Sequence, residues 1–167
     1  MREWLGSWAW RSSGEPYLFI TEDMGKHLLI LLFALCRLPM AEGFAPPSPE
    51  VLDAHLSSLI TKYTLQGKNC LVHCRGGVGR AGLFACSWMI KLGLLGQVVN
   101  IHDPNNKTLD RELQIVESVI AVIRKRRSAK AIETPQQVQF ILHYTHWLAS
   151  TGRHVTARQV LQEAALS

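Results

Sequence analysis

The chain has 167 residues, of which 47% are hydrophobic and 19% are charged, and its formal net charge at neutral pH is +5. This length suits one domain with a hydrophobic core of its own, and this composition excludes an intrinsically disordered chain. The longest strongly apolar run, residues 28–36, is too short for a membrane-spanning helix, which needs about 20 residues. The first residues do not have the pattern of a signal peptide.

The predicted secondary structure alternates short strands with helices. Residues 16–20 favour a strand and residues 21–23 resemble a helix start, whereas the apolar residues 28–38 fit either a buried strand or a buried helix segment. Ser48 and Pro49 are typical of a helix N-cap and of the residue that follows it. The further elements that we expect are a helix at 48–65, a strand at 69–73, helices at 81–92, 109–126 and 134–148, a turn-rich loop at 103–107 and a small helix at 156–166. This order implies an α/β sandwich with a central sheet.

The most informative stretch is His73-Cys74-Arg75-Gly76-Gly77-Val78-Gly79-Arg80. It lies between a predicted strand and a predicted helix, so unpaired N–H groups and the positive end of the helix dipole converge on it. Such a field binds an anion and stabilises a thiolate, which makes Cys74 a candidate nucleophile. The glycines let consecutive N–H groups turn inward, and Arg80 offers two donors to two phosphate oxygens. His73 is a candidate for holding the loop in shape; the alternative is a buried cysteine before a simple glycine turn.

Residues 73–82 resemble the signature of cysteine-dependent phosphatases, a His-Cys pair followed by five residues and an arginine, and more closely its dual-specificity and protein-tyrosine branch. Two other segments fit this resemblance. Residues 38–43, Leu-Pro-Met-Ala-Glu-Gly, resemble the general-acid loop, especially its form in the cyclin-dependent-kinase-associated phosphatases. Residues 131–140 resemble the glutamine-containing segment that closes the tyrosine phosphatase site, with Gln137 at its second glutamine.

The resemblance implies a protein phosphatase that hydrolyses phosphotyrosine, with phosphoserine and phosphothreonine as further candidate substrates. Cys74 would form a phosphocysteine intermediate, and Glu42 would act as the general acid and then as the general base. Gln137 would either orient water or only hydrogen-bond within a helix. No cofactor and no metal are needed, because the loop supplies the positive field. The phosphate would be bound by Arg75, Gly76, Gly77, Val78, Gly79 and Arg80.

The same resemblance implies a three-layer α/β sandwich with a central, mostly parallel sheet flanked by helices. We expect the catalytic domain at residues 36–150, an atypical segment of the same domain at 1–35, and a helix or tail at 151–167. Residues 1–35 either supply substitute strands or leave the sheet shortened. We expect a monomer whose partner is a phosphorylated protein, and neither nucleic acid nor a membrane.

Three residues depart from the usual pattern of the family. Glu42 stands where the family usually has Asp, and its side chain is one methylene longer, so the loop must lie further back; the alternative is a solvated loop residue. Ala81 stands where a Ser or Thr hydroxyl commonly helps the sulfur to leave in the second step. Glu133 stands where related enzymes often carry Gln. Ala81, Glu133 and the short N-terminal stretch favour, as an alternative function, a pseudophosphatase that binds phosphoproteins with little turnover. A rhodanese-like sulfurtransferase is disfavoured by the acid loop and by residues 134–140.

Two further groups of residues have an ordinary interpretation and a functional one. The basic cluster at residues 124–127 fits a solvated helix C-terminus better than a nucleic-acid or membrane site, because no aromatic residues lie among the cations. Cys36, Cys70 and Cys86 fit buried thiols better than partners of a protective disulfide with Cys74. The cysteines have neither zinc-site spacing nor the spacing of a secreted framework, which predicts a reducing compartment, the cytoplasm or the nucleus.

Overall fold

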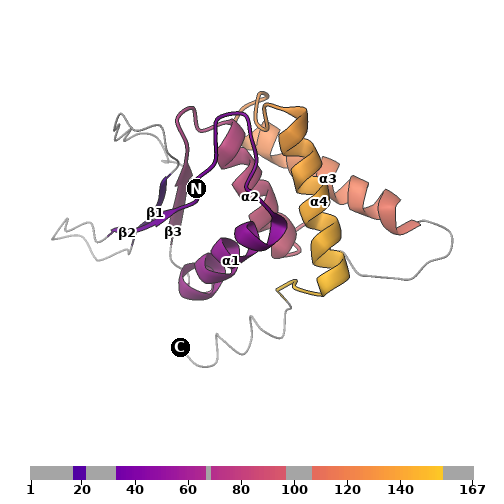
Figure 1. Cartoon of the computed structure of the whole chain (residues 1–167), viewed down its shortest axis with the longest axis horizontal. Helices are drawn as coiled ribbons and strands as arrows, with labels where there is room; N and C mark the ends of the chain where they lie inside the picture. Colours follow the sequence, from indigo (N-terminus) through magenta and orange to yellow (C-terminus); the bar gives the residue numbers. More distant parts are fainter. Residues whose placement is uncertain (1–16, 22–32, 67–68, 97–106, 156–167) are drawn as a thin grey trace.

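The computed structural model describes residues 17–21, 33–66, 69–96 and 107–155 (Figure 1). The strand expected at 16–20 is confirmed, and the apolar stretch at 28–38 contributes a strand rather than a helix. The helix start at 21–23 and the loop at 103–107 lie largely outside the described residues, and the small helix at 156–166 lies wholly outside them. The elements are β1 (Tyr17–Thr21), β2 (Phe33–Arg37), α1 (Pro49–Leu59), a π-helical turn η1 (Ile60–Thr64), β3 (Asn69–His73), α2 (Gly79–Lys91), α3 (Lys107–Arg126) and α4 (Pro135–Thr151).

The ends of α1 and α4 follow from local chemistry that can be read in the sequence. Ser48 caps α1, since its side chain accepts a hydrogen bond from the Val51 N–H at 3.4 Å, and proline follows directly. Thr134 caps α4 in the same way, with proline again at the first helical position. Gly152 ends α4 in the left-handed conformation at φ 64°, which glycine adopts without strain.

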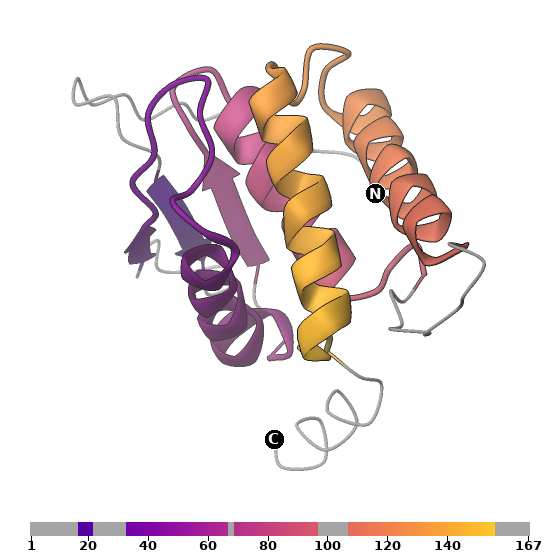
Figure 2. The same ribbon diagram turned by 45° about the vertical axis from the view of Figure 1, so that its right-hand side comes forward.

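The three described strands form one sheet in the order β2-β1-β3, and both neighbouring pairs are antiparallel. The prediction of a mostly parallel sheet is therefore wrong for the described residues. The physical reason is that β1 lies between β2 and β3 and runs opposite to both. The prediction of a central sheet also fails here, because in both views the strands lie at one side of the described structure (Figures 1 and 2). Of the two alternatives for residues 1–35, the structure shows a supplied strand, β1.

The pairing pattern brings two loops to the same edge of the sheet. Because β2 and β3 are each antiparallel to β1, they run in the same direction as one another. Their last residues, Arg37 and His73, both lie opposite Tyr17. The chain therefore leaves both strands at one edge, and the segments that follow them, residues 38–48 and 74–78, start side by side.

The core lies between the helices and fixes α2 in position. One face of α2 buries Leu83, Phe84 and Ile90, while Ile141 and Leu148 of α4 are fully buried against the same cluster. Helix α2 contacts α3, α4 and β3, so it lies in the middle of the packed helices (Figure 2). Burying such aliphatic and aromatic side chains stabilises a fold by about 1.5–3 kcal/mol each. The N-terminus of α2 is consequently held firmly behind the loop that precedes it.

Among the described residues, no helix combines the length and the apolar character that a bilayer crossing requires.

Candidate active site

Side-chain contacts join the segment after β2 to the segment after β3 and to the start of α2. Arg80 donates from Nη1 to the backbone carbonyl of Met40 at 3.2 Å. Arg75 Nη1 lies 3.5 Å from Glu42 Oε2, and both of these side chains are about two-thirds exposed. An ion pair this exposed contributes little to stability. Its significance is geometric, because it shows that the Glu42 carboxylate reaches the glycine loop.

Cys74 lies directly after β3 and is buried, with 6% of its surface exposed. Helix α2 begins five residues later, at Gly79, and the residue before it, Val78, gives the helix no side-chain cap. The first N–H groups of a helix have no partner within the helix, and here the side chain of Val78 does not cap them. A helix N-terminus without an N-cap side chain, next to a buried thiol, is a suitable place for an anion because of its partial positive charge.

Arg80 is the second residue of α2 and is itself buried, with 5% of its surface exposed. Burying a guanidinium is costly unless acceptors surround it. The Met40 carbonyl is one such acceptor, and it belongs to the loop that carries Glu42. The arginine of the predicted phosphate site therefore also fixes the position of the predicted acid loop.

Two residues at the start of α4 hold the acid loop from the other side. Thr134 Oγ1 donates to the carbonyl of Gly43 at 2.7 Å, and Gln137 Nε2 donates to the carbonyl of Phe44 at 3.4 Å. Gly43 itself has a φ of 81°, which favours glycine at this turn. Side chains from α2 and from the start of α4 thus bind three backbone carbonyls of the acid loop, those of residues 40, 43 and 44. The loop is held against the cysteine loop by hydrogen bonds to its backbone.

Gln137 is fully buried, and both ends of its amide are engaged. Its Oε1 accepts from the Glu133 N–H at 2.8 Å, while its Nε2 reaches Phe44. These two hydrogen bonds lie outside α4, so Gln137 links the acid loop to the segment before α4, an arrangement different from the bond within a helix that was one of its two expected roles. The residue lies beside the phosphate loop as well, since a Cβ on Gly79 would be 3.1 Å from Gln137 Nε2.

Glu133 places its carboxylate against the first residue of α2. A Cβ added to Gly79 would clash with Glu133 Oε2, so this position accepts no larger residue while Glu133 is in place. The side chain is exposed overall, yet this oxygen lies beside the first residue of α2. A negative charge therefore stands at the rim of the anion site, where related enzymes often have a neutral glutamine.

The basic cluster at the end of α3 contributes to this region, which the sequence did not reveal. Arg127 donates from Nε to the carbonyl of Gly77 at 3.3 Å, and Gly77 has a φ of 66°. Arg124 donates to the carbonyls of Ala131 and Ile132, at 3.1 and 3.5 Å, and so supports the segment that presents Glu133. A run of arginines at a helix end has no spacing that indicates such contacts; they depend on how α3 packs beside α2.

The remaining predicted residues fall around the same loop. His73 is the last residue of β3 and is half-buried directly before Cys74. Arg75 and Gly76 are exposed, so Arg75 lies at the rim of the loop and not within it. Ala81 is buried as the third residue of α2 and has no hydroxyl to donate toward the sulfur. Thr134, the N-cap of α4, also contacts the acid loop; sequence spacing gives no signal for that second contact.

None of the three other cysteines, Cys36, Cys70 and Cys86, forms a disulfide within the described residues. Burial raises the pKa of Cys36 and of Cys70 above their ordinary value, and it raises that of Cys86 to about 12. Cys36 Sγ lies 3.5 Å from His55 Nδ1, on the side of the molecule where β2 meets α1. Cys86 is a buried thiol, as expected, whereas Cys36 and Cys70 are half-buried; a raised pKa keeps the less nucleophilic thiol form in all three.

The site combines a buried cysteine after a strand, a glycine loop, an arginine on the first turn of the following helix and a facing carboxylate loop. That combination defines the class of cysteine-dependent phosphatases. Residues 31–141 match the family model described as "Swiss Army Knife protein, DSP-PTPase phosphatase domain", and the chain belongs to this family. No curated protein and no solved structure matches the chain. The family supports a dual-specificity type of phosphatase, while the kinase-associated branch stays a prediction.

Proposed function

We propose that this chain is a protein phosphatase that hydrolyses phosphotyrosine through a phosphocysteine on Cys74. Whether it also accepts phosphoserine or phosphothreonine is left to experiment. The observation that carries the proposal is the hydrogen bond from buried Arg80 to the Met40 carbonyl, because it joins the anion site to the loop that holds a carboxylate. Family membership supports phosphatase chemistry in general.

In the first step, the Cys74 thiolate attacks phosphorus and the bond to the leaving oxygen breaks. The equatorial oxygens gain charge in the transition state, and the uncapped N–H groups of α2 and the Arg80 guanidinium are placed to bind them. Arg75, at the rim, adds a cation that attracts the dianionic substrate.

Glu42 is our candidate for the general acid that protonates the leaving oxygen, and then for the base that takes a proton from the attacking water. Its carboxylate reaches Arg75 of the glycine loop, and the backbone of its own loop is bound at residues 40, 43 and 44. These hydrogen bonds fix the loop position, which determines where the longer glutamate side chain ends. Misplacement by about 1 Å costs roughly a hundredfold in rate.

The second candidate function is that of a pseudophosphatase, which binds phosphorylated proteins with little turnover. Two observations favour it. Ala81 offers no hydroxyl to help the sulfur leave, and the carboxylate of Glu133 stands against Gly79 at the anion site. The missing hydroxyl would slow hydrolysis of the intermediate, whereas the carboxylate would weaken the binding of any phosphate dianion.

The test is turnover of p-nitrophenyl phosphate by the wild type, Cys74→Ser, Arg80→Lys and Glu42→Gln, with Cys70→Ser as the matched cysteine control. We expect Cys74→Ser to abolish turnover and Cys70→Ser to leave it unchanged. Loss of a general acid lowers the reaction rate about 10²–10⁴-fold, and the loss is larger for a poorer leaving group. Glu42→Gln should therefore slow phenyl phosphate more than p-nitrophenyl phosphate.

The enzyme proposal fails if folded wild type is no faster than Cys74→Ser. Glu42 is not the acid if Glu42→Gln slows both substrates equally. Binding of a phosphotyrosine peptide to wild type without turnover would establish the pseudophosphatase instead.

A further inference from the structure

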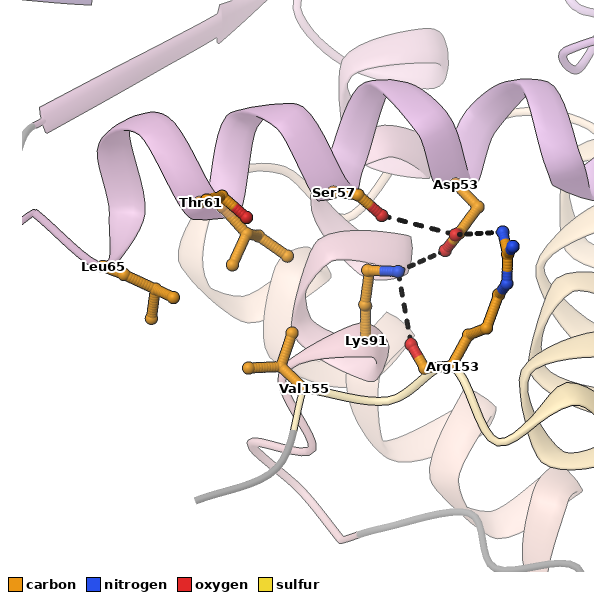
Figure 3. A pocket seen from close by; sticks show the side chains of 8 residues that line it. Asp53, Ser57, Thr61, Leu65, Lys91, Arg153 and Val155 are labelled. Atoms are coloured by element: carbon orange, nitrogen blue, oxygen red, sulfur yellow. Dashed lines mark hydrogen bonds and ion pairs between the residues drawn. The ribbon is translucent and has the colours of Figure 1, made fainter. Parts of the chain in front are cut away.

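A cavity of about 400 Å³ lies at the opposite end of α2 from the phosphate loop. It is bounded by α1 and η1 on one side and by the segment after α4 on the other (Figure 3). Lys91, the last residue of α2, is in its wall, whereas Gly79 begins the helix at the active site. With a rise of 1.5 Å per residue the two ends are roughly 18 Å apart. The size is within the range of small-molecule sites, which is about 300–1,000 Å³.

The carboxylate in this cavity has no acceptor capacity left. Asp53 is buried, and its Oδ1 accepts from Lys91 Nζ and from the Tyr144 hydroxyl at 2.9 Å. Its Oδ2 accepts from Ser57 Oγ at 3.4 Å and pairs with Arg153 Nη1 at 3.5 Å. A carboxylate has about four lone-pair sites, and this one has four donors, of which Figure 3 shows Lys91, Ser57 and Arg153. Asp53 therefore cannot be the group that recognises a ligand.

The side chains around the cavity have more hydrogen-bond donors than these acceptors can use. Lys91 Nζ also donates to the Arg153 carbonyl at 3.3 Å, so within the described part of the chain two acceptors serve its three N–H groups. Arg153 has five N–H donors, and 61% of its side chain is exposed at the mouth. Its guanidinium lies 5.6 Å from the centre of the Trp147 ring, which orients it. Two cations and one saturated carboxylate leave a net positive charge with unused donors.

The end of the cavity away from Arg153 is mostly apolar. In Figure 3 Leu65 and Val155 lie on that side together with Thr61, and Ile60 also lines the cavity. Val155 is fixed there because its N–H donates to the carbonyl of Lys91 at 3.1 Å. The cavity thus has a cationic end and an apolar end in one continuous space.

We propose that this cavity binds a small organic anion that has an apolar portion. A carboxylate or phosphonate-like head would accept from Lys91 and Arg153, and a short aliphatic chain would contact Leu65 and Val155. The proposal does not depend on the activity of Cys74, since it uses neither the phosphate loop nor the acid loop.

The test uses the full chain with its active site occupied by orthovanadate, and calorimetric titration with hexanoate, hexylphosphonate and acetate, with neutral hexanamide as the control. We expect saturable binding of both six-carbon anions, weaker binding of acetate and none of hexanamide. Loss of a hydrogen bond to a charged group costs about 1.5–3 kcal/mol, so Arg153→Gln should weaken hexanoate about tenfold or more. Arg153→Lys should retain most of the affinity, and Leu65→Ala should reduce the advantage of hexanoate over acetate.

The charge-matched control is Arg126→Gln, which removes an exposed arginine at the end of α3. It should leave hexanoate binding unchanged. The proposal is overturned if neither anion binds, if orthovanadate prevents binding, if hexanamide binds as well as hexanoate, or if the Arg153 and Arg126 variants behave alike. Binding that appears only after removal of residues 156–167 also overturns it, since the cavity would then be covered by the chain itself.

Discussion

At the scale of single residues, we expect Ala81 to limit the second step of the proposed reaction. It is buried on the first turn of α2, in the segment that follows the proposed phosphate loop. Ala81→Ser should restore a hydroxyl and raise steady-state turnover by about tenfold, consistent with one hydrogen bond to a charged group. In rapid mixing, the wild type should show a burst of one equivalent of p-nitrophenol that Ala81→Ser lacks. Equal steady-state rates would show that the hydroxyl does not limit this enzyme.

Glu133 acts at the same scale through its charge. Its carboxylate oxygen stands against Gly79, and a like charge about 4 Å from a phosphate oxygen costs about 1 kcal/mol in water. Glu133→Gln should therefore lower KM roughly fivefold, with a smaller effect at high salt. Glu117→Gln, a change of the same charge on the exposed face of α3, is the control. A KM that does not respond to Glu133→Gln would mean that the carboxylate faces away from the substrate.

At the scale of elements, the acid loop depends on the start of α4. Thr134 caps α4 by accepting from the Gln137 N–H, and it also donates to Gly43. Thr134→Val removes both hydrogen bonds and should lower the free energy of unfolding by about 1–2 kcal/mol. It should also slow phenyl phosphate more than p-nitrophenyl phosphate, because it loosens the loop that carries Glu42.

Thr134→Ser keeps the hydroxyl and is the matched control for this prediction. Urea denaturation and the two substrates measure the two effects separately. If Thr134→Val loses stability but keeps the wild-type dependence on the leaving group, Thr134 is a helix cap and nothing more.

At the scale of the whole molecule, buried acidic groups set how stability depends on pH. Burial raises the pKa of Cys86 from its ordinary value of 9.0 to about 12, and burial with the nearby Asp53 raises that of Tyr144 above 10.0. Above about pH 9 the unfolded chain loses protons that the folded chain keeps, so the free energy of unfolding falls as the pH rises. Below pH 9 these two groups contribute no slope.

Urea denaturation at about pH 8 and about pH 10.5 measures this fall. Cys86→Ala removes one of the two groups and should make the fall smaller. A fall as large in Cys86→Ala as in the wild type would assign the pH dependence to other groups.

At this scale, local features of the fold could be predicted from the sequence, whereas contacts between distant segments could not. Features that depend on neighbouring residues can be predicted from the local sequence. They include the strand at 69–73, the loop after it and the helix caps at Ser48 and Thr134. The direction of the sheet was predicted wrongly because β1 pairs with residues far along the chain, which no local pattern specifies. Arg127 was missed for the same reason, since its contact with Gly77 spans 50 positions.

The central claim is that Cys74 takes the phosphoryl group, and trapping of the intermediate tests it most directly. Wild type is mixed with excess p-nitrophenyl phosphate, quenched in acid within the burst phase, digested and analysed by mass spectrometry. The account predicts one phosphoryl group on the peptide that contains Cys74, more of it in Glu42→Gln than in Ala81→Ser, and none in Cys74→Ser. Turnover with no phosphorylated Cys74 peptide under these conditions, or with the phosphoryl group on another residue, would contradict it.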